Sequence, residues 1–165
     1  MPSRLIAIFA LALSTAAYAE QSADSTCEFW MDLGQVYGTV STFRNYKDIC
    51  AELFAEYKKS NDDAYAAWRA KNLKFLQEIE KYRLAAAWKE AKGNQKKYVN
   101  NLAKFDAGMD RYKDVIREQF KSAGREQSQR ICSQQYPRLL LSDQANLEYF
   151  YAEQVATIRS GPQGK

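Results

Sequence analysis

The chain has 165 residues and a formal net charge of +4, with 27% charged and 46% hydrophobic residues. These proportions are typical of a globular domain and exclude a largely disordered or membrane-embedded chain. Because the chain contains no histidine, histidine-based catalysis, haem ligation and most zinc sites are excluded as well.

Residues 1–19 have the three parts of a secretory signal peptide. Arg4 supplies the positive start, Leu5 to Leu13 form a short apolar run, and Ala17-Tyr18-Ala19 is an A-x-A cleavage site. The apolar run is far shorter than the roughly 20 residues that span a bilayer, so we expect no membrane-spanning segment. The expected location is the periplasm, with secretion to the medium as the alternative.

Residues 20–159 are expected to form one domain, and residues 160–165, with two glycines and a proline, a disordered tail. Without Arg4 the net charge is only +3. Such a mild excess gives no reason to expect nucleic acid as a partner.

Hydrophobic spacing predicts a first helix of about eight turns. Its apolar face comprises Phe29, Leu33, Val36, Val40, Phe43, Cys50, Phe54 and Tyr57. A second helix is expected to begin with Ser60 as its cap and to stop at Gly93, where Asn94 caps the next one.

The third predicted helix repeats apolar residues at alternating spacings of three and four. These residues are Tyr98, Leu102, Phe105, Met109, Tyr112, Ile116 and Phe120. The helix is expected to end at Gly124 or to continue through Cys132, and Pro137 would end any such run. Ser142-Asp143 is expected to cap a fourth helix that carries Leu147 and Ile158.

The fold class indicated by these segments is all-α, as an up-down-up-down bundle of about four helices. After residue 19 the chain contains twenty aromatic residues, as many as its leucines, isoleucines and valines together. We therefore expect an aromatic-rich core, in which buried tyrosine hydroxyls need hydrogen-bond partners.

The three cysteines allow one disulfide bond and leave one free thiol. If Cys27 and Cys50 share one helix, about 35 Å separates them, so their pairing would require the helix to fold back. In an up-down bundle the first and third helices are parallel, which brings Cys50 and Cys132 to the same end. We therefore predict a Cys50–Cys132 disulfide with Cys27 as a spare thiol, and keep the Cys27–Cys50 pair as the alternative.

The most distinctive local pattern is Tyr65, Trp68, Arg69 and Asn72 in the second predicted helix. Asn72 occupies a position where the helix face calls for an apolar residue. One interpretation is a buried amide that fixes helix register through hydrogen bonds. The other is a small recognition patch, because Trp and Arg are enriched at binding interfaces.

The sequence lacks the haem-attachment motif CxxCH, the redox motif CxxC, the nucleophile motif G-x-S-x-G and a glycine-rich phosphate loop. No catalytic residue, metal ligand or cofactor is therefore expected. We expect a non-enzymatic helical protein that binds a protein partner in the cell envelope, as an inhibitor, immunity protein or chaperone does. The alternative is a carrier of a hydrophobic small ligand within the bundle.

Overall fold

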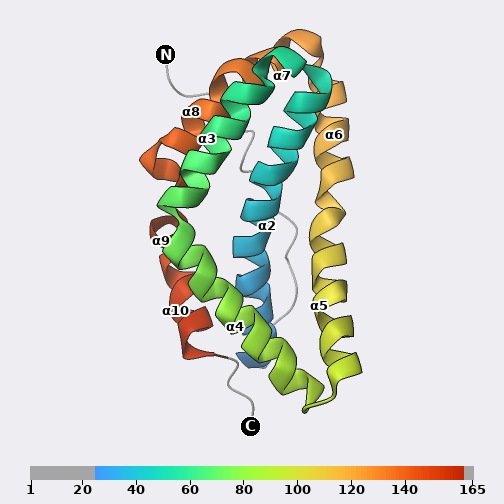
Figure 1. Ribbon diagram of the computed structural model, residues 1–165, viewed down its shortest axis with the longest axis vertical. Coiled ribbons are helices and arrows are strands. Elements are labelled where there is room, and N and C mark those ends of the chain that lie inside the picture. The colour runs from blue at the N-terminus through green and yellow to red at the C-terminus, as the bar shows by residue number, and fades with distance from the viewer. Residues whose placement is uncertain (1–24, 162–165) are drawn as a thin grey trace, which may run out of the picture.

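The computed structural model describes residues 25–161, which form an all-helical structure without strands (Figure 1). The predicted signal peptide, residues 1–19, and residues 162–165 of the predicted tail lie outside the described residues, whereas Ser160 of that tail belongs to a helix. The elements, labelled as in Figure 1, are α2 (Ser25–Leu53), η1 (Ala55–Tyr57), α3 (Lys58–Lys71), α4 (Leu73–Ala91), α5 (Gln95–Asp110), α6 (Tyr112–Ala123), α7 (Arg125–Arg130), η2 (Ile131–Gln135), α8 (Tyr136–Leu141), η3 (Asp143–Ala145), α9 (Leu147–Phe150) and α10 (Ala152–Ser160).

Helix α2 lies in the middle of the molecule and packs against α3, α5, α6 and α10 (Figure 1). Its fully buried residues include Phe29, Leu33, Val36 and Cys50, all on the predicted apolar face. Asn45 and Tyr46 are buried too, so α2 is covered on more sides than one amphipathic stripe would require. The prediction of about four helices in a regular bundle was too simple, because the structure has more segments and a central helix.

The second predicted helix is divided in two at Asn72, whose φ of −98° and ψ of 8° depart from helical values. The helical segment also starts earlier than predicted, at Lys58. Ser60 is therefore not a cap but lies inside the first turn, where its hydroxyl donates to the carbonyl of Tyr57 at 2.9 Å. Such side-chain bonding to a preceding carbonyl is an alternative use of a serine near a helix start.

The predicted reversal at Gly93-Asn94 is confirmed. Lys92 and Gly93 have φ values of 50° and 76°, in the left-handed region that ends helices. Asn94 then caps α5 by accepting a hydrogen bond from the Lys97 amide at 3.0 Å.

The third predicted helix ends at Gly124 but is interrupted at Arg111, between α5 and α6. Only Ile116 and Phe120 of its predicted apolar face are buried, and Tyr112 is 48% exposed. Helix α5 contains no fully buried residue. Its aromatic face covers α2 and α4 from outside instead of forming the centre of the core.

Pro137 does not end the helical run, contrary to the prediction. Proline lacks an amide hydrogen, and its ring collides with the carbonyl four residues earlier in a regular α-helix. The run accommodates Pro137 because η2 is a π-helical turn, in which the Tyr136 amide bonds to the carbonyl of Ile131. Pro137 then falls in the first turn of α8, where no helical partner for its amide is needed.

The last predicted helix begins later than expected. The Ser142 hydroxyl donates to the Leu139 carbonyl at 2.7 Å, so Ser142 finishes α8 instead of capping the next helix. Asn146 provides the cap of α9, and α10 extends to Ser160. Within residues 25–161, no helix combines the length and the apolar character needed to cross a membrane.

Candidate functional site

Asn72 and Trp68 hold a distant segment of the chain through hydrogen bonds to its backbone. The Asn72 side chain donates to the Trp68 carbonyl at 3.0 Å and accepts from the Leu147 amide at 3.0 Å. The Trp68 indole donates to the Ala145 carbonyl at 2.8 Å. An asparagine suits this position because its amide supplies both a donor and an acceptor. We call Trp68, Asn72, Ala145 and Leu147 the clasp.

The clasp determines where the short helix α9 lies. Asn146 caps this helix by accepting from the Tyr149 amide at 3.3 Å. A helix of four residues has no stability of its own in water. Its position therefore depends on the clasp and on the burial of Leu147, which is 2% exposed.

Two adjacent aromatic side chains on α9, Tyr149 and Phe150, point into solvent. They are 83% and 64% exposed, the largest values among the exposed large hydrophobic residues of the described chain. The Phe150 ring packs edge-on against the neighbouring Tyr151, with 5.2 Å between the ring centroids. Tyr151 in turn shares a hydrogen bond with Thr39 of α2. We call Tyr149 and Phe150 the aromatic pair; such exposed apolar groups on a fixed element indicate an interaction surface.

The four residues singled out in the sequence divide between the interior and the surface. Trp68 and Asn72 are 1% and 4% exposed, so their side chains are occupied by the clasp. Tyr65 stacks on Trp68 with 5.5 Å between ring centroids, and its burial raises the pKa of its hydroxyl. Arg69 is exposed and lines a shallow surface depression together with Leu73.

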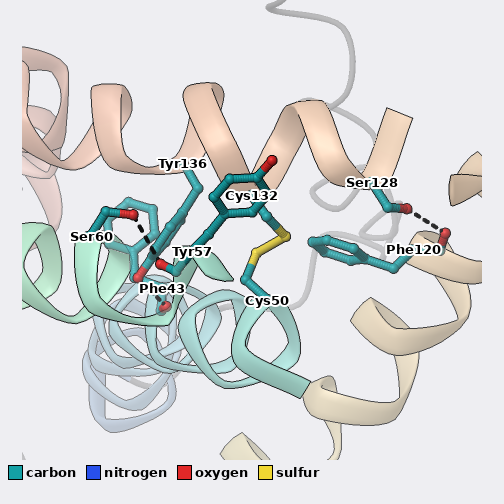
Figure 2. The surroundings of a disulfide bond; sticks show 8 residues. All are labelled: Phe43, Cys50, Tyr57, Ser60, Phe120, Ser128, Cys132 and Tyr136. Atoms are coloured by element: carbon teal, nitrogen blue, oxygen red, sulfur yellow. Dashed lines mark hydrogen bonds between the residues drawn. A yellow bond between two sulfur atoms is a disulfide. The ribbon is translucent and has the colours of Figure 1, made fainter. Parts of the chain in front are cut away.

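The structure places Cys50 and Cys132 at disulfide distance, with 5.4 Å between their Cα atoms. Both are fully buried, and Figure 2 shows the ring of Phe120 directed toward the sulfur atoms. The predicted pairing is thus confirmed, but one of its premises was wrong. Cys132 lies in η2, on the run that follows Gly124, and not at the end of the third predicted helix.

Hydrogen bonds to backbone carbonyls surround the disulfide (Figure 2). The Tyr136 hydroxyl donates to the carbonyl of Phe43 on α2 at 2.8 Å, and the Ser128 hydroxyl donates to the carbonyl of Phe120 on α6 at 2.8 Å. Burial raises the pKa of Tyr136, which keeps its hydroxyl protonated and able to donate. These bonds and the disulfide fasten the run from α7 to α8 onto α2 and α6.

Cys27 is exposed and does not pair within the described chain. It lies in the first turn of α2, the same uninterrupted helix that carries Cys50. The alternative Cys27–Cys50 disulfide is therefore wrong, because α2 does not fold back.

A polar cluster that the sequence analysis missed joins α2, α4 and α5. The Arg83 guanidinium donates two bonds to Glu80, at 2.8 and 2.9 Å, and one to Asp106 at 2.9 Å. Tyr37 donates to Glu80, and Arg83 lies 5.5 Å from the centroids of the Tyr37 and Phe105 rings. The bonds from Arg83 lower the pKa of Glu80, whereas desolvation raises that of Tyr37. In the sequence, only the spacing of three residues between Glu80 and Arg83 indicates an ion pair within one helix. The other members of the cluster, Tyr37 and Asp106, lie on other helices.

In the polar cluster, Arg83 pairs with both carboxylates, with Glu80 at 2.8 Å and with Asp106 at 2.9 Å. Among residues 25–161, no three Cys, Asp or Glu side chains are arranged to hold a metal ion. Comparison with protein-family models, curated proteins and solved structures finds no match. Proposals about function therefore depend on the chemistry of the surfaces described above.

Proposed function

We propose that the chain is an exported helical protein that docks a protein partner of the cell envelope through the aromatic pair. The observation that carries the proposal is the exposure of Tyr149 and Phe150, at 83% and 64%. Aromatic side chains that become buried on association contribute much of the binding energy at protein interfaces.

The clasp supports this proposal because it holds the aromatic pair in place before a partner arrives. Trp68 and Asn72 bond to the backbone on both sides of Asn146. Arg159 of α10 adds an ion pair to Glu148 of α9 at 2.7 Å. A preorganised surface loses less conformational entropy on binding than a flexible loop.

We also propose that the helices form a scaffold of four segments, each antiparallel to the one before it: α2, α3 with α4, α5 with α6, and α8 to α10. Export through residues 1–19, with cleavage after Ala19, would bring this scaffold to the periplasm. The mass of the protein recovered from the periplasmic fraction tests both points, since cleavage leaves Glu20 as the first residue.

The docking surface can be tested by site-specific photo-crosslinking in cells. A photo-reactive amino acid at Phe150 should trap one protein, whereas the same group at Tyr112 on α6 should not trap it. Tyr112 is a suitable control because it is also exposed, at 48%, but lies on a different face.

Affinity for the trapped protein then decides whether the aromatic pair binds it. The double variant Tyr149→Ser/Phe150→Ser should bind at least about a hundredfold more weakly, as expected for the loss of interface hot spots. The matched variant Tyr112→Ser/Val115→Ser should bind as the unmodified protein does, and all should have similar melting temperatures. Equal losses in both double variants, or none in either, would contradict the proposal.

A further inference from the structure

The connection between α4 and α5 forms a projecting tip at one end of the molecule (Figure 1). Lys92 and Gly93 reverse the chain with left-handed φ values, and the Asn94 cap fixes the start of α5. The tip is therefore a defined turn between two helices. We call residues 88–104 the hairpin tip.

Positive charge is concentrated around this tip. Residues 81–105 carry seven basic side chains and one acidic, whereas the other 140 residues carry 17 basic and 19 acidic. Between residues 91 and 105 there is no acidic residue. The net positive charge of the whole chain therefore comes from this one hairpin.

Four lysines of the tip are available to an external anion. Lys92, Lys96, Lys97 and Lys104 are exposed, and none forms an ion pair within residues 25–161. Glu90, the one acidic residue in the sequence of the tip, accepts a hydrogen bond from the indole of Trp30. An anionic partner would therefore displace no ion pair of the described residues at these four lysines.

An exposed tryptophan lies among these lysines. Trp88 is 45% exposed and rests edge-on against Tyr98, with 5.4 Å between the ring centroids. Lys92, the residue directly after α4, follows Trp88 by four positions in the chain. Val99, at the start of α5, is 55% exposed and adds to the apolar surface of the tip.

We propose that the hairpin tip attaches the protein to the surface of an anionic lipid bilayer. Lysines near an anionic leaflet each contribute attraction, and indole rings prefer the boundary between headgroups and acyl chains. A soluble polyanion would engage the lysines but would leave the indole without an apolar environment. The attachment is peripheral and is independent of the docking surface on α9.

Vesicle sedimentation of the full chain tests the attachment. The protein should co-sediment with vesicles of equal parts phosphatidylcholine and phosphatidylglycerol, but not with phosphatidylcholine alone, and added salt should release it. The variant Lys92→Gln/Lys96→Gln/Lys97→Gln should reduce partitioning by about a hundredfold.

A matched triple variant distinguishes the effect of the tip lysines from the effect of the net charge of the protein. Lys58→Gln/Lys59→Gln/Lys121→Gln removes the same charge from exposed lysines on α3 and α6. It should partition at least tenfold more strongly than the triple variant of the tip. Equal losses in the two variants, or equal binding to neutral vesicles, would overturn the proposal.

Trp88 reports whether the apolar part of the tip enters the bilayer. Brominated lipids should quench the fluorescence of the bound protein, and Trp88→Phe should remove most of that quenching. A protein that binds anionic vesicles without quenching, or that binds soluble heparin more tightly than vesicles, would overturn attachment to lipid and indicate a polyanion instead.

Discussion

Asn72 shows how one buried side chain can position a surface. Its amide bonds to the carbonyl of Trp68 and to the amide of Leu147, at 3.0 Å each. Asn72→Leu should lower the free energy of unfolding by about 1–3 kcal/mol, because it leaves a buried backbone amide without a partner. Urea denaturation measures the change.

Asn61 provides the contrasting case on α3. It is fully buried, and neither its Nδ2 nor its Oδ1 bonds to the described part of the chain. Asn61→Leu should therefore raise the free energy of unfolding by about 1 kcal/mol, the opposite sign to Asn72→Leu. A loss of stability as large as that of Asn72→Leu would contradict this account of Asn61.

Glu80 should make stability depend on pH. Arg83 and Tyr37 hold the pKa of Glu80 below its ordinary 4.5. The stabilisation is therefore complete above that value and is lost as the pH falls through the lower pKa of the folded state.

Urea denaturation at a series of pH values below 6 tests this dependence. Stability should fall less steeply with acidification in Glu80→Gln than in the unmodified protein, with Tyr37→Phe in between. Parallel curves for Glu80→Gln and the unmodified protein would show that Glu80 does not contribute.

The sequence indicated where the clasp begins but not what it holds. Asn72 could be singled out because an amide interrupts an apolar helix face. Its partners, Ala145 and Leu147, offer only backbone groups and lie more than 70 residues away. Every residue has a backbone carbonyl, and nearly every residue has an amide, so the identities of these residues do not indicate that their backbones accept or donate these bonds.

Among the elements, the α6–α7 junction depends on glycine. Gly124 has φ of 78° and ψ of 163°, a combination that only glycine adopts readily. An added Cβ would meet no atom within 4 Å, so the cost of Gly124→Ala is conformational and not steric. It should lower the free energy of unfolding by about 1–3 kcal/mol.

Gly38→Ala is the matched control for this prediction. Gly38 lies inside α2 with ordinary helical geometry, and a Cβ there also meets no atom within 4 Å. The substitution should raise the midpoint of thermal unfolding, because alanine favours the helix by about 1 kcal/mol. If both substitutions shifted the midpoint in the same direction, backbone conformation would not explain the effect at Gly124.

Helix boundaries were predictable where the signal is local. Gly93 and Asn94 combine a left-handed residue with a cap and were recognised from the sequence. Pro137 was misjudged because a π turn before it depends on how the run packs around Cys132. Ser142 was misjudged because Asn146, four residues later, is an equally good cap, and burial of Leu147 favours the later start.

At the scale of the whole molecule, the Cys50–Cys132 disulfide closes a loop with a sequence separation of 82 residues. Cys50→Ala/Cys132→Ala should lower the free energy of unfolding by about 4 kcal/mol in the chain-entropy model. Urea denaturation of the oxidised protein and of the double variant measures the difference.

Cys27 is the control for the disulfide. Cys27→Ser should change the free energy of unfolding by less than about 0.5 kcal/mol, because its side chain is exposed. Iodoacetamide should label Cys27 alone in the native oxidised protein. Labelling of Cys50 or Cys132 before reduction would show that the bond does not form in solution.

The all-α fold class followed from the hydrophobic periodicity of the sequence. The cysteine pairing was predicted correctly although Cys132 lies in η2 and not at the end of the third predicted helix. The central position of α2 could not be predicted from the sequence. This helix is buried on several sides but also carries buried polar residues such as Asn45, so its sequence resembles that of a helix with one buried face. The aromatic face of α5 led to the opposite error. It was predicted to lie in the core but is partly exposed, because periodicity does not show how deeply a face is buried.

The disulfide also encloses the hairpin tip, which lies between Cys50 and Cys132 in the chain. A protease that cut the backbone at Gly93 would therefore release no fragment. The two halves would stay covalently joined, migrate together on a non-reducing gel, and separate only after reduction. A cut at this tip would thus leave α2 covalently attached to the segment that carries α9.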